Sequence, residues 1–235
     1  MSHIKSSRLA RLLKWIGSLL LLLMLGIGLW LGHTYQPEPF VQSYTTSATT
    51  HSLDDGSLQL TPDSPNQVGL VFYPGAQVAP AAYLPLLEPL RVQGYTIIIA
   101  KMPLNLAVLD GNAAERLMAK APTITKWFIG GHSMGGAMAS QFAAEHPDTV
   151  SGLMLVGAYP YKDYPASKTL IVYGDLNTSV AKKVNQTENV YVLAGGNHAK
   201  FGAYGHQFGD AAATLSAEQQ RQQTANYMLQ FMQQH

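Results

Sequence analysis

One segment of this 235-residue sequence, residues 125–136, indicates its architecture: Thr125-Lys126-Trp127-Phe128-Ile129-Gly130-Gly131-His132-Ser133-Met134-Gly135-Gly136. Its first part, residues 125–129, is a short apolar run typical of a buried strand. Its last part opens residues 135–145, an apolar segment that we interpret as a helix. The pattern G-x-S-x-G lies between them and centres on Ser133. A strand, a sharp turn and a helix in this order predict a serine that projects from the turn as a nucleophile.

The glycines around Ser133 have a steric explanation. A residue in such a tight turn adopts unfavourable dihedral angles, so the positions two before and two after it must lack side chains. Gly131 and Gly135 meet this requirement, and Gly136 would let the helix pack close to the sheet. The pattern alone is weak in a chain with 21 glycines, and the alternative is a glycine-rich turn with an idle serine. The strand before it and the helix after it favour the nucleophile.

The pattern around this turn repeats along the chain from residue 68 onward. Short apolar runs rich in Val, Ile, Leu, Tyr and Phe predict strands that are buried on both faces, at residues 68–73, 95–100, 125–129, 152–156, 169–173 and 190–193. Longer segments between them predict helices at residues 81–93, 106–120, 135–145, 179–184 and 217–233. Repeated alternation of strand and helix indicates an α/β fold, a mostly parallel sheet with helices on both faces.

The N-terminal region differs in composition. Residues 15–32 contain no charged side chain, and an 18-residue helix spans about 27 Å, close to the hydrocarbon thickness of a bilayer. Residues 1–14 carry four basic side chains, Lys5, Arg8, Arg11 and Lys14, and the next one is Arg91. We therefore expect one transmembrane anchor with the N-terminus inside and the rest of the chain outside. The alternative is a cleaved signal peptide, although Trp30 fits a cleavage site poorly.

The expected organisation has four parts. They are a basic cytoplasmic segment at 1–14, the anchor at 15–32, a polar spacer with an early strand near 57–61 at 33–67, and the catalytic domain at 68–235. Without the four basic residues of the first part, 11 Lys and Arg stand against 14 Asp and Glu, a net charge of −3. A net negative charge of this size does not indicate a surface that binds nucleic acid. The absence of cysteine excludes disulfides and thiolate metal sites, and we expect no metal and no cofactor.

A serine nucleophile needs a base that takes its proton. Five histidines lie at or after the turn: His132, His146, His198, His206 and His235. His198 follows the last predicted strand in a loop with two glycines, which places it at the sheet edge where the turn also opens. His198 is therefore the predicted base, with His206 as the alternative. We interpret His206, Tyr204 and Phe201 as parts of a loop that braces His198.

At these motifs the chain resembles the compact, lidless bacterial group of the α/β-hydrolase superfamily. The resemblance rests on G-H-S-M-G-G at residues 131–136 and on N-H-x-x-F-G-x-Y-G-x-Q-x-G-D at residues 197–210. It extends from about residue 68 to the C-terminus. It implies the α/β-hydrolase fold, Ser133 as nucleophile and His198 as base, and it leaves the natural substrate open.

The third catalytic residue departs from the pattern of these relatives. The order nucleophile, acid, histidine puts the acid after the strand at residues 169–173. Relatives read G-x-x-D there, whereas this chain has Asn177 in the place of the acid and Asp175 two residues earlier. Either residue could orient His198, and Asp163 after the preceding strand is a further possibility. An asparagine can orient a histidine, but it stabilises the imidazolium less than a carboxylate does.

Two backbone N–H groups should form the oxyanion hole. One belongs to Met134, directly after the nucleophile, and the other to Ala76, in the loop after the first core strand. Only residues 157–168 separate the strand at 152–156 from the next strand, which is too short for a lid domain. The expected site is shallow, with aromatic walls from Tyr159, Tyr161, Phe201 and Tyr204, although any one of these residues could instead serve only to pack the domain.

These features predict a membrane-anchored serine hydrolase outside the cytoplasm, a carboxylesterase that acts on small or exposed acyl groups through an acyl-Ser133 intermediate. A thioesterase, an amidase or an acyltransferase would use the same serine. A different class is a non-catalytic binding or scaffolding protein on the same fold, since a fold does not fix a function. Asn177 is the feature that favours this last class.

Overall fold

A computed structural model of the chain describes residues 2–235 and divides it into two compact units, residues 1–34 and residues 35–235. In the first unit the helix α1 (Ser2–Gly32) contains the whole predicted anchor. Among the described residues, no helix is both long enough and apolar enough to cross a bilayer.

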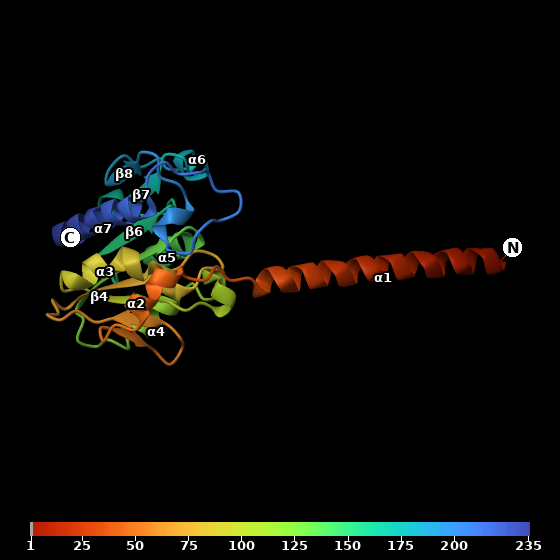
Figure 1. The fold of residues 1–235 in the computed structure, drawn as a ribbon, viewed down its shortest axis with the longest axis horizontal. Helices are drawn as coiled ribbons and strands as arrows, with labels where there is room; N and C mark the ends of the chain where they lie inside the picture. The colour runs from red at the N-terminus through yellow and green to blue at the C-terminus, as the bar shows by residue number, and fades with distance from the viewer. Residues whose placement is uncertain (1) are drawn as a thin grey trace. The chain divides into compact units, whose positions relative to one another are not determined.

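A single mixed sheet is the centre of the second unit (Figure 1). In the described residues its order is β1-β2-β4-β3-β5-β6-β7-β8. The bounds are β1 Thr50–Ser52, β2 Leu58–Leu60, β3 Val68–Tyr73, β4 Thr96–Ile99, β5 Lys126–His132, β6 Gly152–Val156, β7 Thr169–Gly174 and β8 Val190–Leu193. The six strands β3 to β8 run parallel to one another, and β1 and β2 extend the sheet in antiparallel pairs beside β4. The predicted mostly parallel sheet is confirmed.

Helices cover both faces of this sheet. The helices of the second unit are α2 (Gln42–Thr45), α3 (Leu84–Val92), α4 (Ala113–Met118), α5 (Met134–Glu145), α6 (Thr178–Ala181) and α7 (Ala217–Gln234). Short 3-10 helices lie at Pro39–Val41, Pro80–Tyr83, Pro103–Asn105, Ala107–Leu109, Ala166–Lys168 and Ala199–Phe201. Helices α3 and α7 pack on one face, and α4 and α5 on the other, each with its own cluster of buried side chains.

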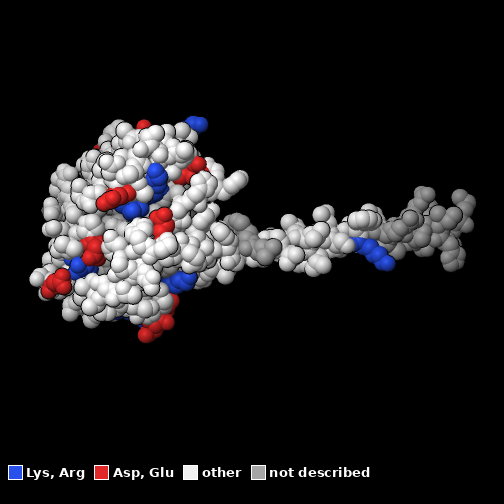
Figure 2. Space-filling model, viewed as in Figure 1, with Lys and Arg blue, Asp and Glu red and all other residues white. Residues whose placement is uncertain are grey.

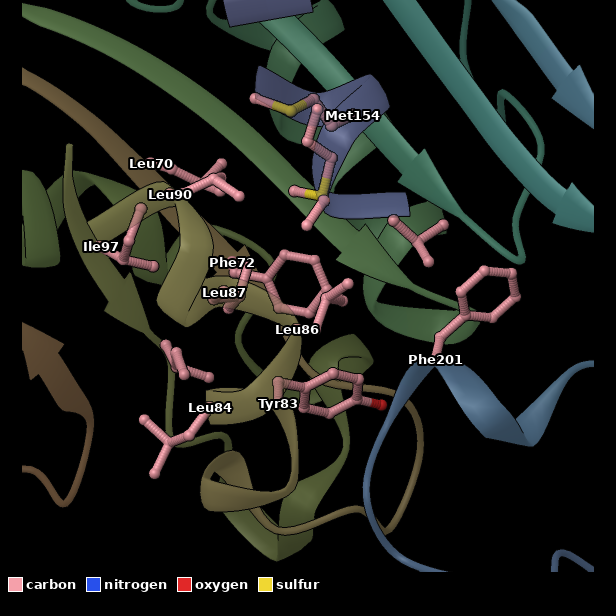
Figure 3. Close-up of a cluster of buried hydrophobic side chains, with 14 of the residues drawn as sticks. Leu70, Phe72, Tyr83, Leu84, Leu86, Leu87, Leu90, Ile97, Met154 and Phe201 are labelled. Carbon is pink, nitrogen blue, oxygen red and sulfur yellow. The ribbon is translucent and has the colours of Figure 1, made fainter. Parts of the chain in front are cut away.

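Alternation of side chains along each strand produces these two cores. On β3, Leu70 and Phe72 point to the face of α3, while Val71 and Tyr73 point to the face of α5. Figure 3 shows the first core, in which the leucines of α3 surround Phe72. The full burial of strands on both sides explains their continuous apolar runs in the sequence.

The structure differs from the expected elements in two regions. Residues 106–120, expected as one helix, form two short helices, Ala107–Leu109 and α4, because Asp110, Gly111 and Asn112 interrupt them. Most of residues 33–67, expected as a spacer, belongs to the second unit. Val41 is fully buried in the core, and β1 and β2 continue the sheet.

Candidate active site

The turn between β5 and α5 holds Ser133 half-buried, directly after the carboxyl end of β5. Ser133 has φ 55° and ψ −122°, a backbone conformation that residues other than glycine rarely adopt. A Cβ atom on Gly131 would lie 2.5 Å from the carbonyl carbon of Gly135, and one on Gly135 would lie 2.1 Å from the carbonyl oxygen of Tyr73. The two glycines are therefore required for the turn to pack against the loop after β3.

His198 lies directly opposite this serine. Its Nε2 atom is 2.9 Å from Ser133 Oγ, a hydrogen-bond distance. His198 follows β8 and precedes the short helix Ala199–Phe201. The other candidate base, His206, lines a separate hollow beside Lys200. The structure thus brings together the predicted nucleophile and the predicted base.

Asn177 occupies the third position of the site. Its amide Nδ2 is 2.7 Å from Nδ1 of His198, on the side of the ring that faces away from Ser133. Asp175 points elsewhere, since its Oδ1 accepts a hydrogen bond from the backbone N–H of Gly195 at 2.8 Å. Asp163 is exposed. Of the three residues considered for this position, the structure places Asn177 against the histidine.

The second amide atom of Asn177 has its own partners. Its Oδ1 accepts a hydrogen bond from Ser179 Oγ at 2.8 Å and a long one from Val180 N–H at 3.4 Å. With the NH₂ group toward the ring, Nδ1 of His198 is an acceptor and the ring proton lies on Nε2. A base that takes a proton from Ser133 needs the opposite tautomer.

A half-turn of the amide would provide that tautomer. Oδ1 would then accept from Nδ1–H, and the hydroxyl of Ser179, which can donate or accept, would accept from the NH₂ group. Only the 3.4 Å contact with Val180 N–H would be lost, and this N–H also donates to the Asn177 carbonyl at 3.1 Å. Ser179 therefore lets Asn177 serve either tautomer of His198.

Asp210 fixes the backbone of the histidine loop. Its carboxylate accepts hydrogen bonds from the backbone N–H groups of His198 at 3.1 Å and of Ala199 at 2.7 Å. Burial lowers the pKa of His198, and the Asp210 carboxylate opposes this shift. Asp210 is the last residue of the second motif, and this position was the signal in the sequence that could have indicated its role.

His132 connects the base loop to the loop after β3. It is fully surrounded by protein, with Nε2 2.9 Å from the carbonyl oxygen of His198 and Nδ1 2.8 Å from the Tyr83 hydroxyl. The hydroxyl in turn accepts from the N–H of Gly75 at 2.9 Å. Burial, and secondarily the charge of His198, hold the pKa of His132 well below its usual range. A neutral His132 that donates from Nε2 satisfies every group in this chain.

The two expected oxyanion donors lie on adjacent segments. Gly135, at the start of α5, lies against the carbonyl groups of Tyr73 and Pro74, so the turn touches the loop that carries Ala76. The neighbours Gly75, Gln77 and Val78 donate their N–H groups to protein acceptors. In the part of the chain that the structure describes, the N–H groups of Ala76 and Met134 donate to no protein atom.

A cavity of about 650 Å³ opens beside Ser133 and His198. Of the four expected aromatic walls only Tyr159 lines it. Phe201 and Tyr204 are buried in the core, Phe201 lying at the edge of the cluster in Figure 3, and Tyr161 is exposed. Phe201 and Tyr204 thus follow the packing alternative, because the loop after His198 folds inward. Its later residue Phe208, with Met134 and Leu176, borders the cavity instead.

A parallel sheet with a serine on the turn after β5 and a histidine after β8 defines a hydrolase of the α/β type. The family model described as "Alpha/beta hydrolase family" matches residues 69–222. The chain belongs to this family, which confirms the resemblance to the superfamily. No curated protein sequence matches the chain closely enough to add to this finding.

Solved structures agree with this fold. Est1E from Butyrivibrio proteoclasticus is 15% identical with a TM-score of 0.53, and the match covers 79% of this chain and 100% of that one. Epoxide hydrolase I of potato (Solanum tuberosum) is 13% identical with a TM-score of 0.52, over 79% and 99%. Ferulic acid esterase from Streptomyces cinnamoneus is 19% identical with a TM-score of 0.51, over 74% and 68%. Because the identities are only 13%, 15% and 19%, these similarities establish the fold alone.

Proposed function

We propose that the protein is a serine carboxylesterase with Ser133 as nucleophile, His198 as base and Asn177 as the residue that orients His198. The observation that carries the proposal is the hydrogen-bonded series from Ser133 Oγ to His198 Nε2 and from His198 Nδ1 to Asn177, at 2.9 and 2.7 Å. Two backbone N–H groups on adjacent segments, those of Ala76 and Met134, support it as oxyanion donors.

The chemistry follows from these positions. Ser133 Oγ attacks the ester carbonyl while His198 Nε2 takes its proton, and the carbonyl oxygen gains negative charge against the N–H groups of Ala76 and Met134. The C–O bond of the ester breaks, and the alcohol leaves with the proton from His198. Water then attacks the acyl-serine with His198 again as base, which releases the carboxylic acid and restores Ser133.

The acyl-serine is the intermediate that separates this proposal from others. Mixing the protein with p-nitrophenyl acetate should give a burst of p-nitrophenol, and rapid acid quench followed by mass spectrometry should find an acetyl group on the peptide that contains Ser133. Turnover without acetylation, or acetylation at another residue, would exclude the mechanism.

A non-catalytic binding protein on the same fold is the second candidate. One observation favours it: as placed, Asn177 presents its NH₂ group to His198, which supports the tautomer that cannot accept the serine proton. A binding protein would give neither a burst nor an acetylated peptide. Thioester, amide or acyl-transfer chemistry would pass through the same acyl-Ser133, and competition between esters, thioesters and amides separates these activities.

We also propose that residues 15–32 anchor the protein in a membrane with the catalytic domain outside the cytoplasm. The charge-free run and the four basic residues before it support this topology. The full-length protein should sediment with membranes, and protease added to intact spheroplasts should degrade the catalytic domain. Recovery of intact protein in the soluble cytosolic fraction would contradict the proposal, and a released form that begins near His33 would indicate cleavage.

A further inference from the structure

The exposed apolar side chains of the catalytic unit gather at one edge of the sheet. Among its described residues, eight large hydrophobic side chains are exposed: Phe40, Val92, Leu104, Val108, Leu109, Tyr161, Val192 and Phe208. Five of them, Leu104, Val108, Leu109, Tyr161 and Phe208, lie on loops that follow β4, β6 and β8. Since these strands are parallel, the loops lie at the carboxyl edge, where Ser133 also lies.

Two of these loops are connected with the active site in different ways. The loop after β4 contacts the region that holds Ala76, since the carbonyl of Asn105 accepts from Gln77 N–H at 2.7 Å. The loop with Phe208 borders the catalytic cavity itself, and Phe208 is 93% exposed. In Figure 1 the yellow-green loop after β4 and the blue loop before α7 project from the same side of the catalytic unit. Figure 2 shows charged side chains in small groups with wide uncharged areas between them.

The chain enters the catalytic unit at this same edge. Tyr35 pairs with Val78 in the loop after β3, with its N–H donating to the carbonyl of Gln77 at 2.7 Å. Two residues, His33 and Thr34, lie between Gly32, the last residue of α1, and Tyr35, so the two ends are three Cα–Cα steps apart. Three such steps of extended chain reach at most about 11 Å. An anchor that ends at Gly32 therefore tethers the catalytic unit by its active-site edge.

We propose that this edge is a membrane-binding surface and that the substrate is an ester presented by the bilayer. The proposal rests on the serine hydrolase activity and the anchor proposed above. Exposed Leu104, Val108, Leu109 and Phe208 enter the interfacial region of the lipid, and the cavity that Phe208 borders receives the acyl group of a membrane-borne amphiphile. The short link to the anchor holds the site at the surface, and the lack of a lid domain leaves it open to short acyl groups displayed there.

Site-specific labels test the surface directly. Because the chain has no cysteine, Val108→Cys, Phe208→Cys and the control Val92→Cys each carry a single thiol in the full-length protein. Val92, at the end of α3, matches Val108 in type and exposure, 61% against 57%, and lies at the opposite edge of the sheet. In phosphatidylcholine–phosphatidylglycerol liposomes, an environment-sensitive label at 108 and 208 should shift to the blue and be quenched by doxyl lipids, while the label at 92 stays in water.

Equal, water-like emission at all three positions would overturn the membrane surface. A blue shift at 108 and 208 without doxyl quenching, dependent on protein concentration, would also overturn it in favour of contact between protein molecules. Both readouts are independent of catalysis, so they separate this proposal from the proposed esterase activity.

Kinetics test the substrate class. The double variant Val108→Ser with Leu109→Ser should hydrolyse soluble umbelliferyl butyrate at the wild-type rate. Its hydrolysis of the same butyrate ester linked to a diacyl lipid should fall about tenfold, because the apolar contacts that hold the edge in the lipid are weakened. Val92→Ser should change neither rate. An unchanged ratio of the two rates in the double variant would contradict a bilayer-presented substrate.

Discussion

The turn after β5 and the turn after β7 contribute to the same site but follow different rules. The first is fixed by sterics, because side chains on Gly131 or Gly135 would collide with backbone atoms at 2.5 Å or less. The second is fixed by hydrogen bonds, since Asn177 caps α6 and contacts His198 with the two ends of one amide. A closely packed position accepts few residue types. A position that acts through hydrogen bonds accepts either a carboxylate or an amide, and exchanging one for the other changes the reaction rate rather than the fold.

The largest effect should come from the first turn. Ser133→Ala removes the nucleophile and leaves the turn intact, so hydrolysis of p-nitrophenyl butyrate should fall by about four orders of magnitude. The melting temperature should stay within a few degrees of that of the wild type, which serves as the control for folding. An alanine variant that retains half of the wild-type turnover would exclude Ser133 from the mechanism.

The second turn should respond in the opposite direction. Asn177→Asp supplies a carboxylate that accepts from Nδ1–H of His198 and stabilises the imidazolium, so kcat should rise about ten- to a hundredfold. The reverse change in a serine protease lowers kcat about 10⁴-fold, which sets an upper limit. The matched control is Asp175→Ala, which removes a carboxylate that contacts Gly195 and should leave kcat within about twofold, as for surface changes. A large loss in Asp175→Ala with no gain in Asn177→Asp would reverse our assignment.

A smaller effect should follow from the loss of His132, which connects the loop of His198 with the loop after β3. His132→Phe leaves the Tyr83 hydroxyl and the carbonyl of His198 buried without their partner, so the free energy of unfolding should fall by about 2 kcal/mol. Urea denaturation measures this change. Tyr83→Phe leaves the N–H of Gly75 and Nδ1 of His132 without their partner, so it should lower stability by a similar amount. Equal stability of His132→Phe and the wild type would show that the hydrogen-bonded series is not a stabilising element.

The smallest effect is a shift of the pH profile. Neutral His198 is the active form, and burial lowers its pKa below 6.5. The value of kcat/KM should therefore rise with pH through an apparent pKa below 6.5 and be constant above it. Asp210→Asn removes the negative charge that opposes the shift, so its apparent pKa should be lower still. An apparent pKa above 6.5 in the wild type would contradict the burial argument.

The sequence predicted the parts of the molecule that depend on local patterns. The strands at 68–73, 152–156 and 190–193 have the predicted bounds, because continuous apolar runs of this length occur in buried parallel strands. The glycine pattern placed the turn at Ser133 correctly, since backbone sterics act between neighbours in sequence. The meeting of His198 with Ser133 followed from the order of strands in a parallel sheet.

Contacts that depend on loop conformation could not be predicted. The G-x-x-D spacing of relatives points to Asn177, but the residues of the turn alone do not decide between Asp175 and Asn177, because an altered conformation of the turn could bring Asp175 toward His198 instead. Phe201 and Phe208 are both aromatic residues of the same loop, yet one is fully buried and the other is 93% exposed. Residues 42–60 were predicted to be part of a polar spacer. They form a short helix and two short strands that are only half-buried at the sheet edge, so their sequence carries few apolar residues.

Labelling with a fluorophosphonate probe would show whether Ser133 is an activated nucleophile, because the reaction requires a serine that a base has activated. We predict that the wild-type protein is labelled on the peptide that contains Ser133, that Asn177→Asp is labelled faster, and that Ser133→Ala and His198→Ala are not labelled. A folded wild-type protein that stays unlabelled while Asn177→Asp reacts would show that the native protein does not use Ser133 as a nucleophile, and would contradict the account.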